Sequence, residues 1–332
     1  MREPAFWWRG AGPQAQLLAP LGLIYGAIAA RRMAKTGAQP GLPVLCVGNF
    51  TLGGAGKTPA VIMLAKMLTD GGGRPVCLSR GYGGSEAGPK LVDGRSDSAA
   101  QVGDEALLLA RAAPTVVARD RVGGAEFART QGASAVILDD GLQNPSLAKD
   151  FTLAVIDAQR GIGNARVFPA GPLRAPLDAQ LARTDALLVV GEGNAADGVA
   201  ARLRAQSRPV FHARLVPDKA AVSALSGHNV LAFAGIGDPD KFFATARAAG
   251  IVVSRRRAFP DHHRYTPQDA SELILRAEHS GLTLLTTEKD RARMDGDPRL
   301  AALAARVQTL PVTMAVQEAG ELRRLIKSKL AH

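Results

Sequence analysis

The sequence has few cysteines and few aromatic residues. Its only cysteines are Cys46 and Cys77, so a small disulfide scaffold is excluded. Each stands inside a short apolar run, which predicts a buried thiol in a strand and a reducing compartment. Aromatic residues make up 5% of the chain, and no basic stretch is interleaved with them. Stacking platforms for single-stranded nucleic acid are therefore not indicated.

Acidic residues are also in short supply. The chain has 30 Asp and Glu against 41 Lys and Arg, which gives a formal net charge of +11. Such an excess indicates an anionic partner, which would be nucleic acid, an anionic membrane surface or a phosphorylated substrate. Because aromatic platforms are missing, the sequence favours membrane and phosphate, and we expect no nucleic-acid partner.

One uncharged stretch lies near the N-terminus. Residues 10–30 carry no charge; Trp7 and Trp8 precede them, and Arg31 and Arg32 follow. The stretch is long enough to span a bilayer, but proline, glycine and glutamine dilute its apolar content. We therefore favour a segment that lies in the membrane interface. A spanning helix and a helix packed on the protein remain open.

From Pro43 onward, short runs that are apolar throughout alternate with segments of helical character. Apolar runs of this kind are typical of parallel strands covered on both faces. The expected strands are 43–48, 75–79, 115–118, 135–139, 152–157, 186–190 and 209–215, and the expected helices are 58–70, 101–112, 121–131 and 197–206. The pattern predicts an α/β fold with a doubly wound, mostly parallel sheet.

A second, smaller α/β region begins near Pro217. Its expected strands are 230–236, 251–254 and 282–287, its expected helices are 240–249 and 267–279, and 309–316 is a candidate last strand before a basic helical tail. We therefore expect three parts: a membrane-associating segment over 1–35, a nucleotide-binding domain over 36–216 and a smaller domain over 217–332.

Residues 47–59 read VGNFTLGGAGKTP and follow a predicted strand. Their second half fits the phosphate-binding loop G-x-x-x-x-G-K-[ST], with Thr51 in place of the first glycine. The expected ATP-binding residues are Thr51, Gly53, Gly54, Ala55, Gly56, Lys57 and Thr58. In such a loop, backbone N–H groups and the helix N-terminus meet the polyphosphate, the lysine reaches the β and γ phosphates, and the threonine holds Mg²⁺.

Two pairs of acids accompany this loop. Asp139 and Asp140 end a predicted strand at the sheet edge where a magnesium-binding acid is expected. Asp104 and Glu105 begin a predicted helix. Acids there either interact with the helix dipole or supply a general base for a substrate hydroxyl, and the residues alone leave that choice open.

Several cationic residues and two histidines lie in predicted loops. Arg80, Arg121 and Arg174 stand near strand ends, where a guanidinium either binds phosphate or is simply solvated. The stretch AFPDHHRY contains His262 and His263. A polar loop, a metal site that still lacks ligands, and a histidine that tunes or relays a proton are three open readings.

Two other classes of P-loop protein fit less well. A membrane-associated ATPase switch or partitioning scaffold would carry its signature lysine just before Gly53, where Leu52 stands. A GTPase would need the base-reading pattern N-K-x-D, whereas residues 287–290 read TEKD. The switch or scaffold is kept as the alternative function.

Taken in order, the motifs resemble those of the tetraacyldisaccharide 4'-kinases, the lipid A 4'-kinases of Gram-negative bacteria. Along nearly the whole chain they are PLGLIYG, VGN..LGGAGKTP, SRGYGG, VGDE, LDDGLQ, PAGPLR, GIGDPDKFF, FPDHH and TTEKD. That family has Thr or Ser where the usual first loop glycine stands, so Thr51 agrees with it. The resemblance implies a P-loop NTPase-like kinase domain, with the smaller domain contributing to the active site.

The implied reaction is ATP- and Mg²⁺-dependent transfer of the γ-phosphoryl group to the 4'-hydroxyl of a lipid-anchored tetraacyldisaccharide 1-phosphate. The resemblance implies that Lys57 is catalytic and that Asp104 is the base, paired with His262. It assigns Mg²⁺ to Thr58, Asp139 and Asp140. The implied substrate-binding residues are Glu105, Arg121, Gln143 and Arg174.

Two positions depart from the family pattern. Asn144 stands where His is usual, and Ala175 stands where Glu is usual, so no role is carried over to residue 175. The resemblance also implies a peripheral, monotopic enzyme on the anionic cytoplasmic face of the bacterial inner membrane. We expect a monomer.

Overall fold

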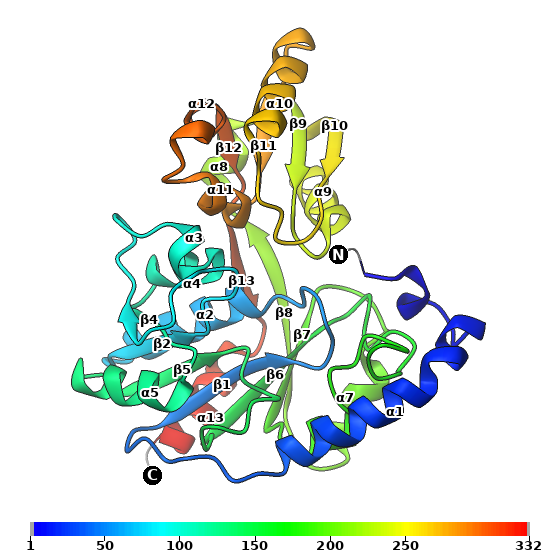
Figure 1. The fold of residues 1–332 in the computed structure, drawn as a ribbon, viewed down its shortest axis with the longest axis vertical. Coiled ribbons are helices and arrows are strands. Elements are labelled where there is room, and N and C mark those ends of the chain that lie inside the picture. The colour runs from blue at the N-terminus through cyan, green and yellow to red at the C-terminus, as the bar shows by residue number, and fades with distance from the viewer. Residues whose placement is uncertain (1–2, 331–332) are drawn as a thin grey trace.

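The structure is a computed structural model that describes residues 3–330. The larger of its two sheets is built from β1 (Val44–Asn49), β2 (Pro75–Ser79), β3 (Lys90–Leu91), β4 (Thr115–Val117), β5 (Ala135–Asp139), β6 (Phe151–Asp157), β7 (Ala186–Val190), β8 (Val210–Pro217) and β13 (Val312–Val316). Within the described residues its order is β13-β8-β7-β6-β1-β5-β2-β4-β3 (Figure 1). All neighbours are parallel except at the two edges, where β13 and β3 are antiparallel. The predicted mostly parallel α/β fold is confirmed.

Helices cover both faces of this sheet. Those associated with it are α1 (Pro13–Met33), α2 (Lys57–Thr69), α3 (Ala99–Val102), α4 (Asp104–Ala110), α5 (Arg121–Thr130), α6 (Leu177–Leu181), α7 (Asp197–Arg204) and α13 (Ala319–Leu330), with a 3-10 turn η1 (Ala5–Trp8). One face packs against α2, α4 and α13, and the other packs against α5, α6 and α7. This double cover explains why the strands are apolar throughout.

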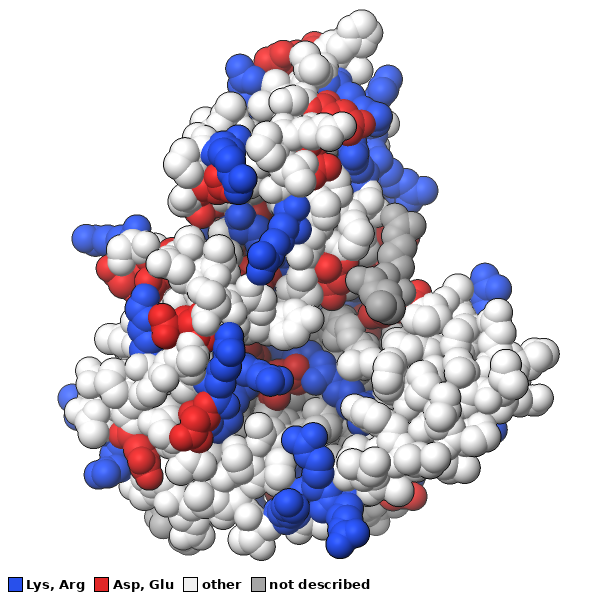
Figure 2. Space-filling view, in the orientation of Figure 1, with Lys and Arg blue, Asp and Glu red and all other residues white. Residues whose placement is uncertain are grey.

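The second unit is a smaller parallel sheet with its own helices. Its strands are β9 (Asn229–Ala234), β10 (Val252–Ala258), β11 (Thr283–Thr286) and β12 (Val307–Thr309), in the order β10-β9-β11-β12. Its helices are α8 (Lys219–Ala224), α9 (Pro239–Ala248), α10 (Pro267–His279), α11 (Glu288–Met294) and α12 (Ala301–Ala304), with η2 (Pro298–Leu300). The unit stands above the large sheet in Figure 1. Figure 2 shows side chains of both charges in the recess between the two units.

The end of the chain does not belong to the second unit, which corrects the expected domain of 217–332. The expected strand 309–316 is two strands, because Pro311 separates β12 from β13. β12 stays in the small sheet, whereas β13 pairs with β8 of the large sheet, with Met314 opposite Leu215. On α13, Leu322 and Ile326 then join the large core. This pairing spans about a hundred residues, so local pattern does not reveal it.

The expected helix 101–112 is also two helices, α3 and α4. Gly103 separates them with φ 87° and ψ 149°, a conformation that L side chains rarely adopt. A Cβ at this position would lie 2.6 Å from the carbonyl oxygen of Tyr82. The break places Asp104 at the first position of α4 instead of inside a longer helix.

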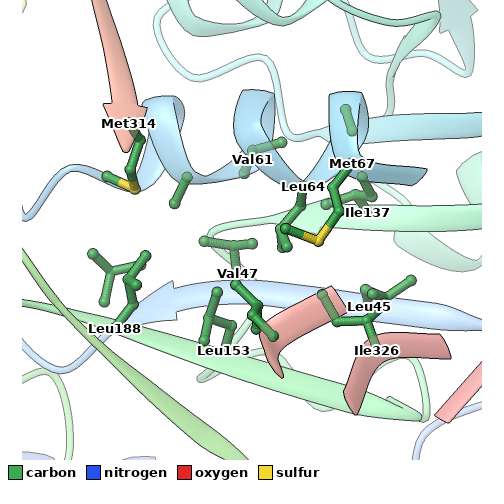
Figure 3. Close-up of a cluster of buried hydrophobic side chains, with 14 of the residues drawn as sticks. Leu45, Val47, Val61, Leu64, Met67, Ile137, Leu153, Leu188, Met314 and Ile326 are labelled. Atoms are coloured by element: carbon green, nitrogen blue, oxygen red, sulfur yellow. The ribbon is translucent and has the colours of Figure 1, made fainter. Parts of the chain in front are cut away.

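The main core lies between β1 and its neighbours on one side and α2 and α13 on the other. Figure 3 shows Leu64 of α2 above Val47 of β1, with Leu153 and Ile326 in the same cluster. Leu64 has no exposed surface. Both cysteines are buried and free, as their apolar runs predicted.

Helix α1 lies along the large unit and exposes one apolar face. Gly22 and Gly26 are buried against the protein, and a Cβ on Gly22 would lie 2.8 Å from Val167 O. The outward face carries Leu17, Leu21, Leu23, Ile24 and Ile28, of which Leu17 is 82% exposed. Among residues 3–330, no helix combines the length and the apolar character needed to cross a membrane.

The buried face of α2 provides a stability test. Leu64→Ala is expected to lower the free energy of unfolding by about 2–5 kcal/mol, because the lost side chain leaves a cavity in a close-packed core. Leu17→Ala on α1 is the matched control and should change it by about 0.5 kcal/mol or less. Urea unfolding followed by circular dichroism measures both. Equal effects would mean that α2 does not pack as described.

Candidate active site

The sheet brings the phosphate-binding loop and the predicted magnesium acids to one edge. β1 and β5 are parallel neighbours, and Val47 pairs with Asp139. The loop after β1 and the pair Asp139–Asp140 therefore leave the sheet side by side. The carboxyl edge of a parallel sheet is where ligands bind in folds of this kind.

The loop itself is held by hydrogen bonds within it. Asn49 donates from Nδ2 to the carbonyl oxygen of Thr51 at 2.7 Å, and Lys57 Nζ donates to Asn49 Oδ1 at 3.0 Å. Gly56 adopts φ 90° immediately before α2 and so turns the chain into the helix. Burial lowers the pKa of Lys57, although the charge of Asp140 opposes that shift. Asn49 was not assigned a role from the sequence, although it stands inside the quoted loop.

The two neighbouring acids have different environments. Asp139 is buried, and its Oδ1 has no hydrogen-bond partner among the described residues. Burial, together with the charges of Glu105 and Asp140, raises the pKa of Asp139 to about 7. Asp140 instead accepts two hydrogen bonds from Arg174 Nη1, at 2.9 and 2.8 Å. Desolvation opposes ionisation of Asp140, but Lys57 and Arg174 outweigh it and lower its pKa to about 2.

Glu105 connects the loop to the second unit. Its Oε1 accepts a hydrogen bond from Thr58 Oγ1 at 3.4 Å and one from Lys289 Nζ at 2.7 Å. The positive charge of Lys289 is the largest cause of the lowered pKa of Glu105. Lys289 belongs to the TTEKD motif and lies in the first turn of α11, so this motif contributes a side chain to the site.

Asp104 is held by two residues of the second unit. It is 4% exposed and accepts a hydrogen bond from Arg293 Nε at 2.7 Å. His262 Nδ1 lies 3.6 Å from its Oδ2. Burial would raise the pKa of Asp104, but the interactions with His262, Arg293 and Lys289 prevail and lower it. Asp104 is therefore a carboxylate at neutral pH.

The predicted residues around this centre divide into two groups. Lys57, Thr58, Asp104, Glu105, Asp140 and His262 are linked by hydrogen bonds, by ion pairs or as neighbours in the chain, and Asp139 precedes Asp140 at the same strand end with its Oδ1 unpartnered. Arg121 and Gln143 make contacts that support the chain: Arg121 donates to the carbonyl oxygens of Leu78 and Asp139, and Gln143 to that of Asn49. Arg174 belongs to both groups, because it donates to the carbonyl oxygen of Thr51 and also to Asp140. Direct contact of these three with a substrate stays a prediction.

The two positions that depart from the family pattern lie away from the reacting groups. Ala175 is fully buried, and its carbonyl oxygen accepts a hydrogen bond from Gln180. Asn144 stands in the loop after β5 and accepts from Ser146 N. Neither residue makes a contact with Lys57 or Asp104 among the described residues.

Arg293 is a second residue of the site, after Asn49, to which the sequence assigned no role. Its side chain is 7% exposed and also donates to Asp290 Oδ1 and to the carbonyl oxygen of Gly235. A signal was present: Lys289 and Arg293 are four residues apart on α11, so both can face α4, where Asp104 and Glu105 lie. Basic residues on a short helix usually indicate a solvated face, so the pattern was not distinctive.

The residues present fit a magnesium ion. Mg²⁺ in nucleotide sites is held by one or two carboxylates and a hydroxyl, and substrate phosphates supply further ligands. Asp139 has a carboxylate oxygen without a hydrogen-bond partner, and the pKa of this residue is raised. Thr58 has a hydroxyl group and directly follows Lys57 in the chain. A cation beside Asp139 would offset the cost of keeping that carboxylate ionised.

The fold and the site together define a P-loop phosphotransferase. The site combines a glycine-rich loop at the edge of a parallel sheet, a lysine, a buried acid whose carboxylate oxygen has no partner, and a second carboxylate close to a histidine. A family model described as Tetraacyldisaccharide-1-P 4'-kinase matches residues 14–331. The chain belongs to this family, which makes it a kinase of lipid A synthesis. The family does not favour the switch or scaffold alternative.

The similarity to individual relatives extends along nearly the whole chain. The tetraacyldisaccharide 4'-kinase of Rhodopseudomonas palustris (strain BisB5) is 54% identical over 330 residues, covering 99% of this chain and 97% of the relative. That of Bradyrhizobium diazoefficiens is also 54% identical with the same coverage. The crystal structure of LpxK from Aquifex aeolicus in complex with ATP superposes with a TM-score of 0.72 at 26% identity, covering 95% of this chain and 99% of that one.

Removing Arg293 should destabilise the protein strongly. Arg293→Met leaves the buried Asp104 without its cationic partner, which is expected to cost about 3–5 kcal/mol in the free energy of unfolding. Arg299→Met, an exposed arginine paired only with Asp297, is the control and should cost little.

The effect of Arg293→Met has a defined pH dependence. Arg293 lowers the folded-state pKa of Asp104, so its contribution is present above the unfolded pKa of about 4 and is lost as pH falls. Chemical unfolding at pH 7.5 and at low pH measures this. A difference between wild type and variant that does not shrink on acidification would contradict the role of Asp104.

Proposed function

We propose that Lys57, Asp104 and His262 carry the transfer of the γ-phosphoryl group from ATP to the 4'-hydroxyl of tetraacyldisaccharide 1-phosphate. The observation that carries this assignment is the approach of His262 to Asp104, 3.6 Å, in the recess that also holds the phosphate-binding loop. The donor loop comes from the large unit and the histidine from the small one. Family membership supports the choice of donor and acceptor.

The donor end of the reaction uses the loop and α2. The backbone N–H groups before α2 and the helix N-terminus favour the negative charge of the phosphates. The ammonium group of Lys57 is held beside the loop by its hydrogen bond to Asn49, and Asp140 lies 3.8 Å from it. In this role Lys57 stabilises the charge that develops on the transferred group as the bond between β-phosphate and γ-phosphorus breaks.

The acceptor end uses the Asp104 carboxylate. The 4'-hydroxyl oxygen attacks the γ-phosphorus, ADP leaves, and the hydroxyl proton passes to Asp104. A carboxylate of lowered pKa is a weak base, but phosphoryl transfer has a loose transition state in which orientation of the nucleophile matters most. His262, with its proton on Nδ1, keeps the carboxylate oriented towards the hydroxyl.

We further propose that Mg²⁺ accompanies ATP and is held by Asp139 and Thr58. The ion would neutralise charge on the β and γ phosphates. The orphaned Asp139 Oδ1 supports this role, whereas Asp140 already has Arg174 as its partner. Asp140 therefore acts through Lys57 and Arg174 and contacts the ion less directly than the sequence predicted.

We propose that α1 lies along the cytoplasmic face of the inner membrane and binds it through its exposed apolar side chains. Its outward Leu and Ile residues form an exposed apolar stripe, and Arg31 and Arg32 follow at its end. Apolar residues next to cations suit a surface of acyl chains and anionic headgroups. A peripheral position would give the kinase access to a lipid-anchored acceptor. A monomeric state stays a prediction.

The assignment of the histidine is testable by substitution. His262→Ala is expected to lower kcat about 100-fold at saturating ATP and lipid, because Asp104 loses the group that orients it. His279→Ala, an exposed histidine on α10, is the control and should keep full activity. Labelled ATP and tetraacyldisaccharide 1-phosphate in mixed micelles provide the assay. Unchanged kcat in His262→Ala would overturn the pairing with Asp104.

The magnesium assignment has a test that does not depend on turnover. In the wild type, removing Mg²⁺ with a chelator should weaken ATP binding measured by calorimetry. Asp139→Asn should bind ATP with nearly the same affinity in the presence and absence of Mg²⁺, because it lacks the anionic ligand. Asp240→Asn, an exposed acid on α9, should behave as the wild type. A metal dependence retained in Asp139→Asn would assign the ion to other residues.

A further inference from the structure

A second cavity lies outside the recess, where α1 ends. It has a volume of about 300 Å³ and lies between the segment after α1 and the loop after β5. Its apolar wall includes Met33, Leu142 and Leu147, and its polar wall includes Lys35, Lys149 and Arg183. Asn144, the position at which this chain departs from the usual histidine, also lines it.

The cations of this cavity have no acidic partner. Lys149 Nζ donates to the carbonyl oxygens of Asn144 at 2.7 Å and Leu142 at 3.4 Å, so its ammonium is fixed in place. Within residues 3–330, no carboxylate lies within ion-pair distance of Lys35, Lys149 or Arg183. Burial lowers the pKa of Lys149, and the charge of Arg183 acts in the same direction. A half-buried cation next to another cation is stabilised by an anion.

One acid lines the cavity and limits the choice of ligand. Asp185 accepts a hydrogen bond from Thr152 N through Oδ2 at 2.7 Å and lines the cavity. Three cations and one carboxylate leave a net positive charge. A ligand with net negative charge is therefore favoured over a zwitterion, and hydroxyl groups on it have Asp185 and Asn144 as hydrogen-bond partners.

The position of the cavity indicates where the anion comes from. Met33, which lines the cavity, is the last residue of α1, and Lys35 follows two residues later. The exposed apolar stripe of the same helix ends five residues before Met33, at Ile28. Figure 2 shows Lys and Arg side chains gathered over the part of the molecule where α1 ends in Figure 1. A helix lying in the membrane interface would hold this cavity at the depth of the headgroups.

We propose that this cavity binds the phosphate of an anionic phospholipid with a hydroxylated headgroup, and so fixes the end of α1 on the membrane. The proposal rests on the proposed membrane association of α1. It adds a specific headgroup site to a surface that would otherwise bind only through apolar contact and diffuse charge. The phosphate lies against Lys149 and Arg183, and headgroup hydroxyls donate to Asp185.

The test uses the whole protein and a soluble probe, dihexanoyl phosphatidylglycerol below its micelle concentration. Calorimetry should give saturable binding to the wild type, weakened about fivefold or more by Arg183→Ala and by Lys149→Met, since one cation near a phosphate contributes about that factor. Lys66→Ala, which removes an exposed cation on α2, is the matched control and should bind as the wild type. Arg183 is exposed, so its variant is expected to fold even where Lys149→Met does not.

Further binding measurements distinguish a lipid headgroup from other ligands of the cavity. Equal affinity for inorganic phosphate would assign the site to free phosphate and overturn the lipid. Equal affinity for dihexanoyl phosphatidylcholine, or unchanged binding by Arg183→Ala, would also overturn the proposal. Flotation with phosphatidylcholine vesicles containing phosphatidylglycerol tests the membrane association separately. If the wild type and the variants all float with the vesicles but none binds the soluble probe, the membrane association is retained and the headgroup site in the cavity is rejected.

Discussion

Two ion pairs across the boundary between the units, Asp104 with Arg293 and Glu105 with Lys289, are the contacts on which the site depends. Asp104 and Arg293 are almost fully buried, so separating them would leave an uncompensated charge, at a cost of about 3–5 kcal/mol. The pairs therefore fix α11 against α4. His262 reaches Asp104 only because the small unit is held in this orientation. The reactive centre is thus assembled by two ion pairs that form between the units.

The sequence predicted the structure correctly where the structure depends on residues close together in the chain. Parallel strands covered on both faces must be apolar throughout, so β1, β5 and β6 were readable, and the glycines and lysine before α2 identified the loop. Family resemblance supplied the pairing of Asp104 with His262, which residue types alone left open. What failed was non-local or depended on one backbone position. Gly103 ended a helix that periodicity would continue, and β13 paired with β8 far away in the sequence.

Arg293 shows why the remaining part of the site was not predictable. Its neighbours on α11 carry mixed charges, as an exposed helix would, and nothing local marks it as buried. Its burial follows from the docking of α11 on α4. The same limitation applies to Asp139 and Asp140, which are adjacent and chemically identical. Only their partners separate them, since Arg174 neutralises Asp140 whereas Asp139 keeps an oxygen without a partner.

One segment links α1 to the phosphate-binding loop. Val167 touches α1 at Gly22, where only a glycine allows the approach, and a few residues later Leu173 forms a β-bridge with Thr51 of the loop. Arg174 then donates to the carbonyl oxygen of Thr51 and to Asp140. Because so few residues separate these contacts, the proposed binding of α1 to the membrane would also set the height of the loop above it. An acceptor anchored by acyl chains has its own fixed height. Matching of the two heights would orient the 4'-hydroxyl towards the donor, since membrane and protein would each constrain one reactant.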